Sequence, residues 1–169
     1  MKSRSPFSGF IVLAALAGTA AAAPSPGFDG LVRATAALCA SNPSTACVAY
    51  AFTALDLDHD GELSVGELDR ARDQLGAWTA AQGESLPFPV RHGIGTALRV
   101  VDLVGVERAL YLYDSDGDGG LTLKEATQDL RLDQRPIGEI YAEGRLIDWT
   151  RIRAALGPSA FLLDYLGLE

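Results

Sequence analysis

The stretch Asp56–Glu67 contains residues whose types and spacing could bind a metal ion. Acidic side chains at its first, third and fifth positions can direct carboxylate oxygens at one hard cation, and a glutamate at the twelfth can supply two more. Gly61 at the sixth position permits the sharp backbone reversal of such a loop, and the seventh position offers its carbonyl oxygen. The predicted ligands are Asp56, Asp58, Asp60, Glu62 and Glu67, with Ser64 acting directly or through water.

The same spacing recurs in Asp114–Glu125, where Gly119 takes the place of Gly61. A single cluster of aspartates and glycines is most simply explained as a solvated surface turn. Two complete copies with the same twelve-residue ligand spacing favour metal binding instead. The predicted ligands of the second stretch are Asp114, Asp116, Asp118, Gly120, Thr122 and Glu125.

Both stretches resemble the calcium loops of the EF-hand family at every ligand position. The resemblance implies an all-α fold of helix–loop–helix hands, with the two loops joined by a short two-stranded β-bridge and with additional helices. It also implies two Ca²⁺ ions, since all proposed ligands are oxygens and the twelfth residue is glutamate. Lanthanide-selective members of the family have proline at the second loop position, where this chain has Leu57 and Ser115.

Helical periodicity flanks both loops. We expect one helix from Phe28 up to Ser41 and a second from Pro43 to Leu55, with Asn42 as the N-cap of the second. Further helical patterns cover 68–75, 96–113 with a break at Gly105, 123–130 and 161–166. Residues 76–95 give no clear pattern, and we expect an irregular connection there, with His92 in a glycine-rich turn.

The two loops begin 58 positions apart, which is farther than in a compact EF-hand pair. The hands, at about 44–75 and 103–132, could pair directly around an insertion at 76–95. Alternatively, each could pair with a degenerate hand that has lost its ligands. Residues 137–156 look like such a remnant, because their twelfth loop position falls on Thr150 or Arg151, and neither can supply a bidentate carboxylate.

Residues 1–23 have the layout of a secretory signal peptide: a basic start, an apolar stretch at 7–17 and small residues at 20–23. The apolar stretch is shorter than the about 20 residues that span a bilayer, which argues against a membrane anchor. Cleavage near Ala22 would leave 24–169 as a single domain, periplasmic or secreted. In an exported protein we expect Cys39 and Cys47 to form a disulfide, the alternative being two small buried residues that never meet.

The chain has 14 basic and 22 acidic residues, a net charge of −8, and loss of Lys2 and Arg4 would make it about −10. This acidity argues against nucleic acid or anionic membrane surfaces as partners. The sequence contains no nucleophile–base constellation and no phosphate-cradling glycine loop, and neither His59 nor His92 is expected to be a ligand. We therefore expect no enzyme, no membrane insertion after signal removal and a monomer.

Two roles fit a calcium-binding domain of this kind. Calcium could reorient the flanking helices of a sensor and expose an apolar groove for a protein partner, which is the role we expect. Alternatively, the domain could be a calcium buffer or a structural module that does not switch. Met1 is the only methionine, so a sensor groove would be built from leucine, valine and aromatic side chains.

Overall fold

The computed structural model describes residues 26–82, 85–86 and 88–166. The predicted signal peptide and its cleavage site lie outside the described residues. Within the part of the chain that the structure describes, no helix has both the length and the apolar composition needed to span a membrane.

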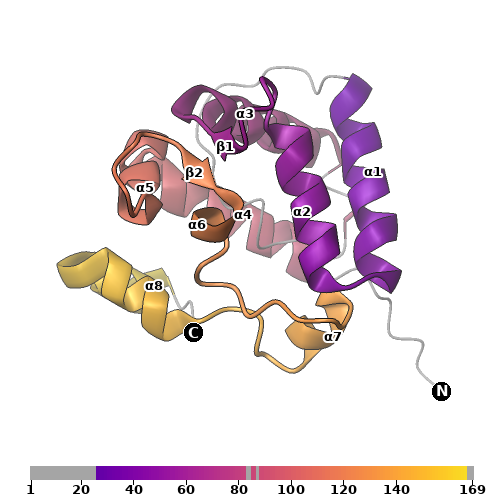
Figure 1. Ribbon diagram of the computed structural model, residues 1–169. Coiled ribbons are helices and arrows are strands. Elements are labelled where there is room, and N and C mark those ends of the chain that lie inside the picture. Colours follow the sequence, from indigo (N-terminus) through magenta and orange to yellow (C-terminus); the bar gives the residue numbers. More distant parts are fainter. Residues whose placement is uncertain (1–25, 83–84, 87, 167–169) are drawn as a thin grey trace.

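The described chain is mostly helical, which confirms the expected fold class (Figure 1). Short connections separate successive helices, and the two strands are only two residues long. The elements in order are α1 (Pro26–Ser41), α2 (Ser44–Leu55), β1 (Glu62–Leu63), α3 (Val65–Gln82), α4 (Phe88–Val104), α5 (Val106–Tyr113), β2 (Leu121–Thr122), α6 (Leu123–Ala126), α7 (Ile137–Ala142), α8 (Trp149–Leu156), the 3₁₀ turn η3 (Gly157–Ala160) and α9 (Phe161–Leu166).

The two acidic loops pair directly with each other through β1 and β2. The strands are antiparallel, with Glu62 opposite Thr122 and Leu63 opposite Leu121. The sequence left two arrangements open, and the structure shows the one in which the two hands pair directly with each other. The wide spacing of the loops is taken up by helix, because α3 extends to Gln82 and α4 is an additional helix before α5.

Two local expectations about this insertion are wrong. Much of 76–95 is helical, and His92 lies within α4 instead of a glycine-rich turn. The helix α3 ends at Gln82 and α4 begins at Phe88. The glycines obscured the helical pattern because they weaken intrinsic helix propensity, whereas packing against neighbouring helices stabilises the helix here. The predicted break at Gly105 is confirmed, since this residue has a φ of 86° between α4 and α5.

The main hydrophobic core lies between the two hands. Leu63 and Leu121, which face each other across the strand pair, are both almost fully buried in it. The additional helix α4 contributes Val101, so it completes this core instead of standing apart. The buried members are Phe52, Leu63, Leu68, Val101, Val106, Ala109, Leu110 and Leu121.

The corner between α1 and α2 corrects the predicted N-cap. The side-chain amide of Asn42 donates to the carbonyl of Leu38 at 3.1 Å, and its backbone N–H donates to the same carbonyl at 2.9 Å. Asn42 therefore closes α1, because its short polar side chain finds an acceptor in the preceding turn. Pro43 is the N-cap of α2 and makes no side-chain capping bond. The predicted disulfide between Cys39 and Cys47 is present, with a Cα–Cα distance of 4.9 Å.

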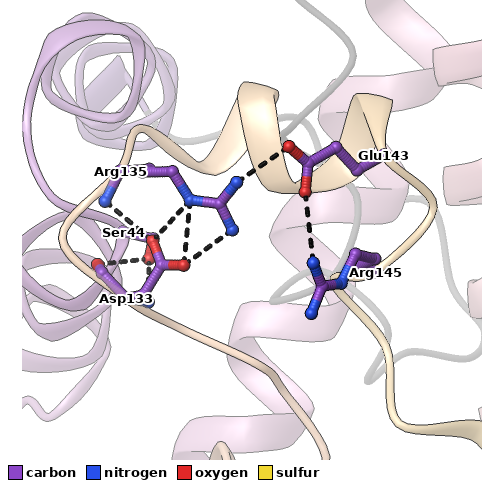
Figure 2. A network of polar contacts seen from close by, with 5 residues as sticks. All are labelled: Ser44, Asp133, Arg135, Glu143 and Arg145. Atoms are coloured by element: carbon purple, nitrogen blue, oxygen red, sulfur yellow. Dashed lines mark hydrogen bonds and ion pairs between the residues drawn. The ribbon is translucent and has the colours of Figure 1, made fainter.

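A polar network fastens the start of α2 to the chain that follows the second hand (Figure 2). The buried Ser44 hydroxyl donates to the carbonyl of Asp133 and accepts from its N–H, both at 2.9 Å. The guanidinium of Arg135 bridges the carboxylates of Asp133 and Glu143 at 2.7 and 2.8 Å. Because half-exposed ion pairs contribute little, the buried Ser44 bonds provide most of this attachment.

Residues 143–148, between α7 and α8, pair with neither acidic loop. They run beside the segment after α6, where Leu130 and Ile147 form an antiparallel bridge. The N–H of Arg131 donates to the carbonyl of Leu146 at 2.8 Å, and the N–H of Asp148 donates to that of Asp129 at 2.7 Å. The assignment of 137–156 as a degenerate hand stays a prediction.

Candidate metal centre

In the first loop, Asp56, Asp58 and Asp60 each place a carboxylate oxygen within 4.8 Å of the other two. Asp56 follows the last turn of α2, is only 5% exposed, and accepts through Oδ2 from the N–H of Gly61 at 3.0 Å. Its Oδ1 is buried and has no hydrogen-bond partner among the described residues. A buried, unpaired carboxylate oxygen is costly unless a cation compensates it, so these residues fit a hard metal ion.

The second loop repeats the group of three aspartates, with Asp114, Asp116 and Asp118 again within 4.8 Å. Both oxygens of Asp114 are engaged, since it accepts from the N–H of Gly117 at 2.7 Å and from that of Gly119 at 3.0 Å. Desolvation and the negative charge of Asp118 raise the pKa of Asp116. A bound cation would relieve this repulsion.

The twelfth-position glutamates are held in the same way in both loops. Glu67 accepts from the N–H of Leu57 at 2.5 Å through Oε1, and from the N–H and hydroxyl of Ser64 at 2.9 and 2.8 Å through Oε2. Glu125 accepts from the N–H of Ser115 at 2.8 Å, and from the N–H and hydroxyl of Thr122 at 3.0 and 2.7 Å. These bonds orient both carboxylates before any metal contact.

The same bonds lower the pKa of both glutamates. Burial alone would raise the pKa of Glu67, but the donors on Ser64 and Leu57 outweigh it and the pKa lies below its usual value. The hydroxyl of Thr122, followed by backbone donors, lowers the pKa of Glu125. Calcium binds the ionised form of a carboxylate. The hydrogen-bond donors around Glu67 and Glu125 therefore favour the form that binds the ion.

Two positions in each loop adopt left-handed backbone. The sixth-position Gly61 and Gly119 both have a φ of 93°, as the sequence predicts. The fourth position is also left-handed, with a φ of 62° at His59 and 79° at Gly117. This conformational demand was missed from the sequence, although Gly117 is the residue that could have indicated it. His59 meets the demand at a steric cost that glycine does not have.

The frame of the second hand depends on a side-chain clamp that the sequence did not indicate. The exiting helix α6 ends at Ala126, short of the predicted 130. Instead, the Tyr113 hydroxyl donates to Asp129 Oδ2 at 2.7 Å, and the Gln128 side-chain amide donates to the carbonyl of Tyr113 at 3.2 Å. Burial raises the pKa of Asp129, while the bond from Tyr113 opposes this rise. The end of α5 and the chain after α6 are thereby tied together.

Residues 48–70 match the family model described as EF hand. The match covers most of α2, all of the first loop and the start of α3. No curated protein and no solved structure gives a match. With the two acidic groups and the paired loops, the match shows that the chain contains an EF-hand domain, which implies calcium binding. The structure brings the predicted ligands together in two groups, and the part that each residue plays in binding stays a prediction.

Proposed function

We propose that this protein binds two calcium ions, one in each loop, and that the ions stabilise a domain whose hands are already joined. The buried and unpaired Oδ1 of Asp56 is the observation that most directly supports an ion in the first loop. The second loop has the same three-aspartate group and the same twelfth-position glutamate held by two backbone N–H groups. Both loops therefore offer the oxygen ligands that calcium prefers.

Three features favour stabilisation over switching. Calcium sensors reorient the helices that flank their loops, whereas α6 has only four residues and gives calcium a short lever. The clamp from Tyr113 to Asp129 opposes separation of the segments that flank the second loop. The disulfide ties the start of α2 to α1, and the Ser44 hydrogen bond ties it to the segment that contains Asp133.

A calcium sensor that binds a protein partner is the second candidate. It is favoured by two exposed apolar side chains, Leu103 near the end of α4 at 65% and Tyr111 near the end of α5 at 77% exposure. In this role, calcium would enlarge an apolar surface around them. Export to the periplasm or the medium is part of either proposal, supported by the disulfide and by the signal-like residues 1–23.

A calcium titration of the mature protein separates the two roles. Calorimetry would count the ions, while a dye that fluoresces on exposed apolar surface would follow the surface. We expect saturation at two equivalents with a flat or falling dye signal. A rising signal would favour the sensor, and saturation at one equivalent or none would contradict the two-ion proposal. The Tyr113→Phe variant removes the clamp bond, so a calcium-induced rise in this variant alone would identify the clamp as what prevents opening.

A further inference from the structure

We propose that Glu62, a residue of the first loop, acts on the second calcium site through its side chain. Its backbone carbonyl is the seventh-position ligand expected for the first ion, so one residue would contribute to both sites. This inference rests on the proposed binding of two ions.

The strand register directs the Glu62 side chain toward the second loop. Glu62 is opposite Thr122 in the antiparallel pair. Its side chain therefore lies on the face of the strand pair that also carries Thr122 and the position two residues before it. That position is Gly120, the seventh residue of the second loop. Glu62 therefore extends over the loop of the other hand.

Gly120 provides the space that Glu62 fills. A Cβ atom on Gly120 would lie 2.9 Å from Cβ and 3.2 Å from Cδ of Glu62, and closer still to the carboxylate. Gly120 is not among the residues with positive φ, so its backbone conformation does not require glycine. The absence of a side chain at this position is thus explained by the approach of Glu62.

The Glu62 carboxylate lies against the acidic second loop. A Cβ atom on Gly120 would meet Oε2, Cβ and Cδ of Glu62 and no other heavy atom among its three nearest. Asp118 is the fifth-position ligand predicted for the second ion. Glu62 thus adds a carboxylate to the four of the second loop, and a calcium ion there would replace repulsion between Glu62 and Asp118 with attraction to both.

The test is a calcium titration of the Glu62→Gln variant, monitored by NMR. The amide signal of Gly61 reports on the first site and that of Gly119 on the second. Loss of one negative charge next to a divalent ion in a solvated site should weaken the second site on the order of tenfold. We expect the first site, whose carbonyl ligand is retained, to weaken less than the second, because the Glu62 carboxylate extends over Gly120 of the other loop. Glu107→Gln removes an exposed charge elsewhere, on α5, and should leave both sites unchanged.

One further variant and one further measurement test the same inference. Gly120→Ala retains the charge but displaces the Glu62 side chain, so it should also weaken the second site more than the first. Without calcium, Glu62→Gln should raise the melting temperature, because it removes the repulsion from Asp118. If wild type binds two ions and Glu62→Gln leaves the second site unchanged, or weakens only the first, this inference is wrong while the proposed function holds. If wild type binds no ion in the second loop, the proposed function itself fails.

Discussion

The two loops have the same acidic residues at four predicted ligand positions but differ at the fourth and seventh positions. Asp, Asp, Asp and Glu recur at the first, third, fifth and twelfth positions. The fourth position is His59 in one loop and Gly117 in the other, and the seventh is Glu62 and Gly120. The ion constrains the first set, whereas the second set responds to backbone conformation and to the neighbouring loop. Glu62 and Gly120 fit each other, which only a paired arrangement of the loops explains.

The two hands also differ in how they are framed. The first loop lies between helices of 12 and 18 residues, and the second between helices of 8 and 4 residues. The second hand compensates with the clamp from Tyr113 to Asp129 and with the pairing of Leu130 and Ile147. Side-chain and backbone bonds to distant parts of the chain can therefore replace a long exiting helix in holding a calcium loop.

The largest expected effect comes from the residues that the two loops share. Glu67→Gln and Glu125→Gln each keep the size of the side chain and remove one bidentate ligand. We expect each variant to lose affinity at its own site by more than the about 10–100-fold that loss of an outer-shell partner costs. Calorimetry should then detect one ion in each variant at concentrations where wild type binds two. Unchanged stoichiometry in either variant would refute the ligand assignment for that loop.

Removing the disulfide should have a smaller effect on calcium binding, and the effect should differ between the two hands. Replacing both Cys39 and Cys47 by serine should lower the free energy of unfolding by about 2–3 kcal/mol, through the larger freedom of the unfolded chain. Because Cys47 lies in α2, which enters the first loop, calcium affinity should fall more in the first loop than in the second. Urea unfolding and site-resolved titration would measure the two effects. An equal loss at both sites would show that α2 does not act on the first loop in particular.

The smallest effect is expected at the fourth loop position. Exchanging the residues there tests whether the two loops have the same backbone conformation at this position. Gly117→His should lower the free energy of unfolding by about 1 kcal/mol, because left-handed backbone costs a residue with a Cβ about 1–2 kcal/mol. His59→Gly should raise it by less than about 1 kcal/mol, since the greater freedom of glycine in the unfolded chain offsets part of the gain. Thermal unfolding of the calcium-free protein would measure both. A stabilising Gly117→His would contradict the shared conformation.

The sequence by itself determined the two loops and the kind of ion that they fit, because the predicted ligands lie within twelve consecutive residues and their spacing is local. The helices that enter both loops, the break at Gly105 and the disulfide also follow from local patterns. The extent of α3 and α4 did not, because tertiary packing overcame the weak helical propensity of a glycine-containing stretch.

Only the tertiary structure decided which elements meet. It selected the direct pairing of the two loops, assigned Asn42 to the end of α1, and brought Asp129 to Tyr113. It also turned the Glu62 side chain toward Gly120 of the other loop. These contacts join residues up to 60 positions apart, and their geometry depends on strand register and on the packing of the core. A periodic pattern shows which face of a helix or strand is apolar, but it does not show which other element that face will pack against.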